Sequence, residues 1–166
     1  ALAHGRDRRE GREPPGVEEP IELFERHRVG QVALVVLQDD RQLGKLDGAV
    51  VVTTPQDVAL ADVRKSIRFC HQLSIPVLGL VENMSGFVCP KCGEVTQILP
   101  GGGGKKIAED MKVPYLGSIP MDAAIAQSGD SGKVFVYHFS KTPTGKIMQD
   151  IMNQITDDLN KIKKLN

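Results

Sequence analysis

The stretch DGAVVVTTPQDVALADVRK, from Asp47 to Lys65, joins a continuous apolar run to an amphipathic segment and decides the fold class. Gly48–Thr53 is rich in valine and has no polar alternation, which is typical of a strand buried on both faces. Gln56–Leu73 then repeats apolar residues at helical spacing, which predicts a helix with one buried face. The apolar positions of this helix are Leu60, Val63, Ile67 and Cys70.

Strands and helices are predicted to alternate through the rest of the chain. The last helix is expected to begin near Thr142, a good N-cap, with Pro143 in its first turn. This alternation predicts an α/β fold with a doubly wound, mostly parallel sheet, a small Cys-x-x-Cys hairpin insertion, and helices on both faces. The further elements are strands at Pro76–Val81 and Pro114–Ile119, a hairpin or knuckle at Cys89–Leu99, short helices at Lys105–Met111 and Asp122–Gln127, and a final apolar stripe of Ile147, Ile151, Ile155, Leu159 and Ile162.

The N-terminal segment differs in composition from the remainder. Thirteen of residues 1–28 are charged, and prolines interrupt any period, so we predict a charged, disordered leader there. Residues 29–166 are predicted to form the α/β domain, with one early strand candidate at Gln31–Leu37. If part of the sheet is absent from this chain, we expect the apolar edge next to Gly48–Thr53 to be uncovered and to favour association.

Charge and composition exclude several classes of partner. Lys and Arg total 21, as do Asp and Glu, so the net charge of zero argues against binding to nucleic acid or an anionic membrane. Aromatic residues make up only 4% and tryptophan is absent, which disfavours base stacking. We see neither a secretory signal nor a run long enough to cross a bilayer, and expect a cytoplasmic location.

Cys89-Pro-Lys-Cys92, followed by Gly93, is the sharpest chemical signal in the sequence. Two intervening residues let both thiols face one ion, and Gly93 permits the tight turn that follows. Thiolates bind zinc and iron–sulfur centres, and the spacing favours neither. Two chains related by a two-fold axis would supply the pair twice and make a four-sulfur site. Cys89 and Cys92 are therefore candidate metal ligands.

Other interpretations of the pair stay open. A thioredoxin-like redox motif needs its first cysteine near a helix N-terminus, whereas the residues after Gly93 predict a strand. A structural zinc knuckle and a pair that binds no metal also fit the residues. Cys70 lies in the buried stripe of the first predicted helix, so we expect it to be structural, and we expect His71 on that helix's surface.

The glycine run Gly101–Gly104 does not match a phosphate loop. In that motif Ser or Thr follows the Gly-Lys pair and binds magnesium, whereas Lys106 follows Gly104-Lys105 here. We predict a turn that caps a helix, and the sequence holds no other match to the motif.

Three predicted strands end in polar or turn residues, at Thr53–Pro55, Glu82–Met84 and Ile119–Met121. Ligands of such sheets bind beyond the carboxyl ends of the strands, so these tips are predicted to line one crevice. The Asn83 amide can both donate to and accept from a purine edge, but asparagine after a strand is usually a turn residue. Asp122 is most simply a helix N-cap.

Taken together and in this order, the motifs resemble the Mrp/ApbC-type ATPases of iron–sulfur cluster assembly, which belong to the MinD/ParA class of deviant P-loop proteins. The resemblance covers roughly residues 47–160. It rests on Asp47–Lys65, Gly79–Gly86, the cysteine pair, the glycine run and Val113–Asp122.

The resemblance implies a doubly wound sheet, ATP binding, homodimerisation, and a [4Fe–4S] cluster held by Cys89 and Cys92. It also implies that Asn83 contacts adenine, and that Pro120 and Asp122 lie in the loop beside the base. The family's phosphate loop and its Asp-x-Pro-Pro-Gly stretch do not occur in residues 1–46. The chain is therefore similar to the C-terminal half of such a protein.

The leading hypothesis is an iron–sulfur cluster carrier or scaffold. A [4Fe–4S] cluster would bridge two chains through the cysteine pair and pass to apo acceptor proteins. The alternative is a non-catalytic zinc-knuckle binding module derived from such an ATPase. An active ATPase with an unrecognised phosphate site ranks third. Because the Walker A motif is absent, binding of ATP with magnesium is in doubt, and we expect hydrolysis to be absent or very weak.

Overall fold

The computed structural model describes residues 23–29, 32–38, 46–99 and 101–165. In this part of the chain, no helix is long and apolar enough to cross a membrane. The elements in chain order are β1 (Leu23–Val29), β2 (Val32–Gln38), β3 (Leu46–Thr53), α1 (Asp57–Gln72), β4 (Val77–Val88), β5 (Val95–Thr96), α2 (Gly103–Met111), β6 (Tyr115–Met121), α3 (Ala123–Asp130), α4 (Phe135–His138) and α5 (Pro143–Leu165).

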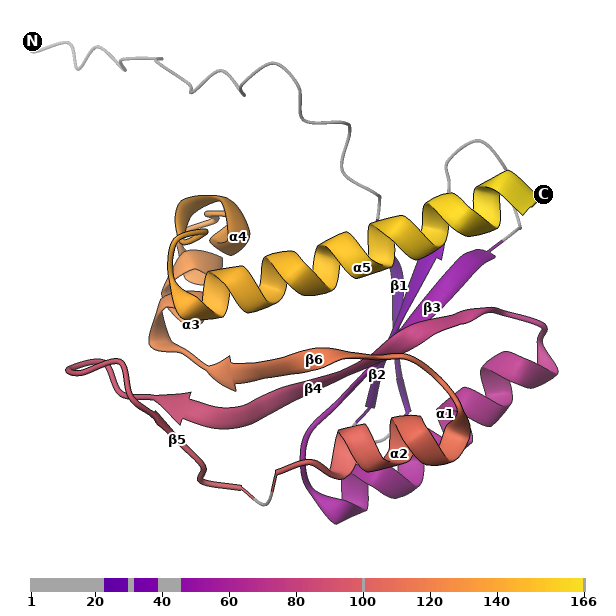
Figure 1. Cartoon of the computed structure of the whole chain (residues 1–166), viewed down its shortest axis with the longest axis horizontal. Coiled ribbons are helices and arrows are strands. Elements are labelled where there is room, and N and C mark those ends of the chain that lie inside the picture. The colour runs from indigo at the N-terminus through magenta and orange to yellow at the C-terminus, as the bar shows by residue number, and fades with distance from the viewer. Residues whose placement is uncertain (1–22, 30–31, 39–45, 100, 166) are drawn as a thin grey trace, which may run out of the picture.

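Helices cover both faces of one sheet, as predicted. The helices α1 and α2 lie on one face and α5 crosses the other (Figure 1). Alternate residues of β3 supply the two cores: Ala49 and Val51 pack with α1 and α2, whereas Val50 packs with α5. The apolar positions predicted for α1 and α5 all take part in these cores. They are Leu60, Val63, Ile67 and Cys70 in the first, and Ile147, Ile151, Ile155, Leu159 and Ile162 in the second.

The sheet is mixed, so the prediction of a mostly parallel sheet is wrong. β4 pairs in parallel with β3 and with β6, and these three strands form the part that the βαβ pattern predicts. β1–β2, β2–β3 and β4–β5 are all antiparallel. Antiparallel strands can be joined by a short connection, and β1, β2 and β3 are consecutive among the described elements.

The expectation of an uncovered edge beside β3 is also wrong. β2 pairs along β3 from Ala33 opposite Val52 to Gln38 opposite Leu46, and β1 pairs with the far side of β2. The strand β1 also includes the last residues of the predicted leader. These residues form a strand because the neighbouring strand β2, and not their charged composition, decides whether they pair. Residues 1–22 of that leader lie outside the described residues, so the division into leader and domain stays a prediction.

Most other elements agree with the sequence within a few residues. Thr142 caps α5 as predicted: its Oγ1 accepts a hydrogen bond of 3.0 Å from the Gly145 amide. The short helix α4 was not predicted, because its four residues carry no helical period. The strand β4 runs to Val88 instead of ending near Val81, and it reaches the cysteine pair directly.

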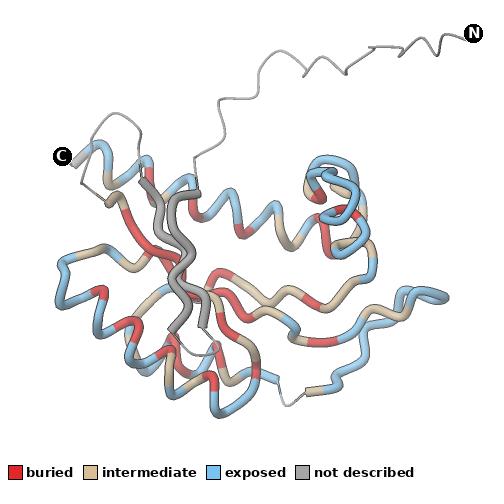
Figure 2. Tube along the Cα trace, turned by 180° about the vertical axis from the view of Figure 1, so that it is seen from behind, coloured by how far each residue is buried: buried red, intermediate tan, exposed pale blue. Residues whose placement is uncertain are grey.

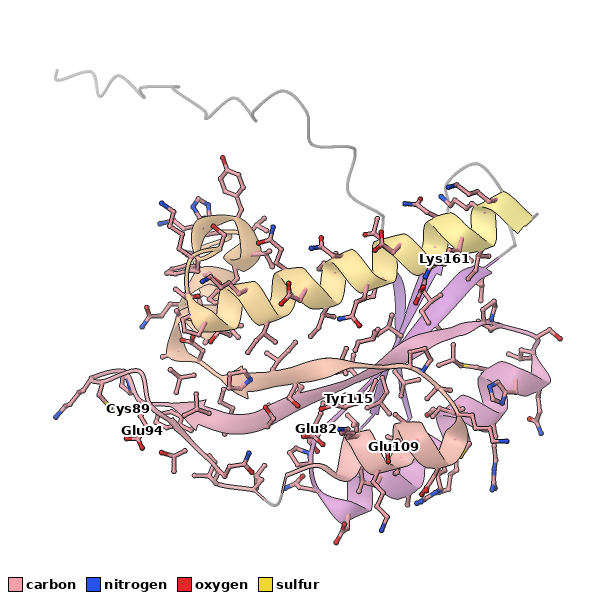
Figure 3. The ribbon with its side chains drawn as sticks, viewed as in Figure 1. Glu82, Cys89, Glu94, Glu109, Tyr115 and Lys161 are labelled. Atoms are coloured by element: carbon pink, nitrogen blue, oxygen red, sulfur yellow. The ribbon has the colours of Figure 1, made fainter. Side chains whose placement is uncertain are left out.

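The glycine run serves close packing between α2 and β4. The Gly104 amide, in the first turn of α2, donates a 2.7 Å hydrogen bond to Oε2 of Glu82, whose side chain is almost fully buried. A Cβ atom at Gly104 would lie 2.9 Å from that oxygen and 3.1 Å from Leu80, so a larger residue cannot fit without a shift. The carboxylate also complements the positive end of the helix. Figure 3 shows Glu82 directed toward α2.

Replacing Glu82 with alanine should destabilise the fold, because it leaves the buried Gly104 amide without its acceptor. A hydrogen bond to a charged group is worth about 1.5–3 kcal/mol, and we expect a loss of that size in the free energy of unfolding. Glu82→Gln keeps an acceptor oxygen and should lose less. Urea denaturation of the full chain measures both changes.

The matched control is Glu109→Ala on the exposed side of the same helix α2. Its effect should stay within about 0.5 kcal/mol, as is usual for surface substitutions. Equal losses at Glu82 and Glu109 would contradict the assigned hydrogen bond.

Candidate functional site

The carboxyl ends of three parallel strands lie side by side. Thr53 of β3 pairs with Glu82 of β4, and Glu82 pairs with Ser118 of β6. One residue further along β4, Asn83 pairs with Ile119, which immediately precedes Pro120. The structure therefore brings together the three strand tips that the sequence singled out.

The burial of β4 changes at Asn83. Residues Leu78 to Glu82 are buried, whereas Asn83 is half-buried and Met84 is exposed. The Asn83 Oδ1 atom accepts a 2.9 Å hydrogen bond from the Met84 amide, and Met84 adopts a left-handed φ of +59°. The carbonyl of the side chain therefore holds a local turn, and its amide group stays available to a ligand.

Asp122 caps a helix, as its simplest interpretation predicted. Oδ1 accepts from the Ala124 amide at 2.9 Å, and Oδ2 accepts from the buried Thr144 hydroxyl at 2.8 Å. One carboxylate thus ties the start of α3 to the start of α5. Pro120 is buried in β6, which pairs with β4 alone among the described strands, and proline is tolerated in such an outer strand.

The cysteine pair sits at the tip of a hairpin that projects from the sheet. Phe87 and Val88 of β4 pair with Thr96 and Val95 of β5, and the connecting turn carries both cysteines. We call residues 84–98 the cysteine arm. It extends away from the helices, and most of its residues are exposed (Figures 1 and 2). This hairpin was predicted from the sequence.

Hydrogen bonds shape the turn before any metal is bound. The Gly93 amide donates to the Cys89 carbonyl at 2.8 Å, and the Cys89 amide donates to the Glu94 carbonyl at 2.9 Å. Gly93 adopts a φ of +76°, which only glycine tolerates readily. Backbone hydrogen bonds from Cys92 and Lys91, together with the Cys92 side chain, hold the pKa of the Cys89 thiol below its usual range. The same amides favour any thiolate ligation at Cys89.

The arm offers two sulfur ligands from one chain. Cys89 is half-buried, Cys92 is exposed, and all three cysteines are free thiols. Cys70 is fully buried in the core between α1 and the sheet, where burial raises the pKa of its thiol, and His71 is exposed as predicted. Among the described residues, no three or more His, Cys, Asp or Glu side chains gather as a metal site. A complete four-ligand site therefore needs a second source of ligands.

Apolar side chains flank the thiols on the cysteine arm. Four of its large hydrophobic residues are exposed, with exposed fractions between 38% and 55%. We call them the arm patch, and they are Met84, Phe87, Val95 and Ile98. Exposed apolar residues gathered on one projecting hairpin are typical of a contact surface.

The sequence analysis placed Glu82 at a strand tip but predicted neither its burial nor its polar neighbours. Glu82 is buried beside Ser118, whose hydroxyl hydrogen bonds to the Tyr115 hydroxyl. Burial raises the pKa of Tyr115, and the Glu82 charge adds to this rise, whereas the Ser118 hydrogen bond opposes it. The sequence did contain a signal for this polar site. A glutamate lies in the apolar run GLVENM, and glutamate is seldom fully buried without a partner.

The architecture and the cysteine arm define an α/β protein with a paired-thiol site on a hairpin beside the strand tips. Residues 29–156 match the family described as ParA, NUBPL iron-transfer P-loop NTPase. This match covers more than half of the chain, and the chain belongs to this family. The resemblance inferred from the motifs is therefore confirmed.

Two curated insect proteins are similar in sequence. Both are described as cytosolic Fe-S cluster assembly factor Nubp2 homologues. The Anopheles gambiae protein is 45% identical over 112 residues, covering 68% of this chain and 43% of that protein. The Aedes aegypti protein is 49% identical over 110 residues, covering 66% and 42%. The chain thus spans less than half the length of these relatives.

Two solved structures are also similar. A nucleotide-binding protein from Archaeoglobus fulgidus, in complex with ADP, has 39% identity and a TM-score of 0.49, covering 55% of this chain and 38% of that one. The cell division ATPase MinD of Pyrococcus furiosus has 21% identity and a TM-score of 0.48, covering 64% and 41%.

Asp122→Ala should destabilise the chain, because it removes the cap of α3 and the partner of the buried Thr144 hydroxyl. The loss of an N-cap costs about 0.5–2 kcal/mol, and leaving the Thr144 hydroxyl without its acceptor adds to that cost. Thermal unfolding followed by circular dichroism measures the shift in Tm. Asp130→Ala, at the exposed end of the same helix, is the matched control and should leave Tm nearly unchanged. A silent Asp122→Ala would contradict the capping role.

Proposed function

We propose that this chain carries an iron–sulfur cluster as cargo during the maturation of iron–sulfur proteins. The observation that carries the proposal is the preformed turn at the tip of the cysteine arm, which backbone hydrogen bonds close and which holds both thiols. Nearby backbone amides also hold the pKa of the Cys89 thiol below its usual range. Thiolates supported by such hydrogen bonds suit iron–sulfur ligation. Membership of an iron-transfer family and the assembly-factor names of the insect relatives support the same function.

We further propose that the cargo is a [4Fe–4S] cluster bridged between two chains. Such a cluster takes four thiolates, whereas one arm supplies Cys89 and Cys92 only. A two-fold axis at the arm tips would complete the set, and the arm patch would bury apolar surface in the same contact. The partner for this step is a second copy of the chain.

Release of the cargo would proceed by exchange of thiolates with an apo acceptor protein. Cys92 is more exposed than Cys89, whose thiol pKa is held below its usual range by nearby backbone amides. An incoming acceptor thiolate would therefore displace Cys92 before Cys89. Because the arm projects from the body, the far side of the cluster would stay open to the acceptor (Figure 2).

The nucleotide contacts inferred from the resemblance remain proposals. The free amide group of Asn83 lies next to the β6 segment that ends in Pro120, and both lie at the strand tips where an adenine base would bind. Asp122 would act there by fixing the loop, since its carboxylate oxygens are engaged by Ala124 and Thr144. The glycine run offers no phosphate site, because the Glu82 carboxylate already occupies the start of α2 and would repel phosphate.

A second candidate function is a zinc-knuckle binding module without ATP turnover. The observation that favours it is the same turn, since amide-supported thiolates also suit zinc. The names of the insect relatives support a cytosolic location for either function, and we propose that location for this chain.

Anaerobic incubation with iron and sulfide should load half a [4Fe–4S] cluster, or about two iron atoms, per chain. The loaded protein should absorb broadly in the visible range. Cys89→Ser and Cys92→Ser should each abolish this loading, because the site would lose a ligand from both subunits. Iron and acid-labile sulfide analysis measures the result.

Cys70→Ser is the matched control, since Cys70 lies in the core and should not affect loading. Equal loading of the Cys89→Ser, Cys92→Ser double variant would contradict the ligand assignment. Zinc without iron or sulfide in freshly purified protein would favour the zinc-knuckle binding module.

Intrinsic ATP hydrolysis should be absent or very weak in this chain. The sequence lacks the phosphate-loop lysine and amides that stabilise the transition state, and Glu82 blocks the alternative at α2. Phosphate release at saturating magnesium–ATP measures the rate. Turnover that copurifies with the chain through successive columns would refute this expectation, and saturable heat on calorimetric titration would revive the ATPase hypothesis.

A further inference from the structure

The two thiols of the cysteine arm are close enough to interact with each other. The Cys92 side chain lies near enough to the Cys89 sulfur to help lower the pKa of that thiol. The turn holds them there: the Gly93 amide bonds back to the Cys89 carbonyl, and the Cys89 amide bonds to the Glu94 carbonyl. In the described part of the chain, no His, Asp or Glu joins them to make a group of three.

The backbone of this turn also suits a covalent link between the sulfurs. The Gly93–Cys89 hydrogen bond closes a single turn of helical type, in which residues three apart have Cα atoms about 5 Å apart, and this lies within the range that disulfides need. Gly93 permits the turn through its positive φ, and a side chain added there would meet nothing within 4 Å. A small molecule can therefore approach the turn from solvent, as the exposure of Cys92 also indicates.

We infer that the metal-free arm closes into a reversible Cys89–Cys92 disulfide by exchange with small-molecule disulfides, so that oxidation of the arm blocks metal uptake. The exposed Cys92 sulfur attacks the small disulfide, forming a mixed disulfide and releasing one thiol. The Cys89 sulfur then attacks the Cys92 sulfur and expels the second thiol. The arm loses two electrons and two protons, and the small disulfide gains them as two thiols.

This chemistry is restricted to the arm. Cys70 is fully buried on α1 and packed among the apolar residues of the core, so a small disulfide cannot reach it in the folded chain. The arm is also no redox catalyst of the thioredoxin kind, since Cys89 follows a strand and not a helix N-terminus. The inferred disulfide is a switch that decides whether the two arm thiols are available to bind a metal, and it applies to iron and zinc alike.

The test uses the full chain, freed of metal and carrying Cys70→Ala so that only the arm thiols remain. After incubation with glutathione disulfide, trypsin cleaves between Lys91 and Cys92 and separates the two cysteines. We expect the two peptides to stay joined in the mass spectrum until a reductant is added. With Cys89→Ser in the same chain, the mixed disulfide on Cys92 should persist, because no second thiol resolves it.

Thiols that stay reduced in excess glutathione disulfide, or stable glutathione adducts on both sulfurs, would overturn the inference. A second measurement tests the switch: the oxidised chain should take up no cobalt or iron, and reduction should restore uptake fully. Unchanged uptake after oxidation would also overturn it. If the disulfide forms but the reduced chain binds no cluster, the inference survives and the proposed cargo function fails.

Discussion

The structure depends on the placement of β4, which is buried along its first half and partly exposed along its second. From Leu78 to Glu82 the strand pairs in parallel with β3 and β6, and both of its faces are covered by helices. Beyond Asn83 the same strand leaves the core and pairs only with β6 and the short β5. One continuous strand therefore carries both the strand-tip residues and the cysteine arm, and the arm takes its direction from the rigid part of the sheet.

The central βαβ part of the fold was predictable, because its signals are local. Valine-rich Gly48–Thr53 and the apolar stripe of α1 each specify an element without reference to neighbours. The order β1–β2–β3 was not predictable in the same way, since strand direction depends on which partner is available and not on the residues of β2 alone. The expected uncovered edge of β3 failed for that reason.

In the candidate site, too, the local features were predictable from the sequence and the long-range contacts were not. The spacing of Cys89 and Cys92, with Gly93 after them, specified a tight turn, and the turn is present. The cap at Asp122 was predicted as well, but its second bond to Thr144 joins residues far apart in the sequence and carries no local signal. The burial of Glu82 is the clearest omission: it follows from the close approach of Gly104, which only the folded chain reveals.

The central claim is that two chains pool their thiols around one cluster. Native mass spectrometry of the anaerobically loaded chain tests it directly, because intact mass reports chains and cluster together. We predict one species that contains two chains and a single [4Fe–4S] cluster, and only monomers once the cluster is removed or Cys92 is replaced by serine. A monomer that retains a whole cluster, or a cluster-free dimer as the main species, would contradict the account.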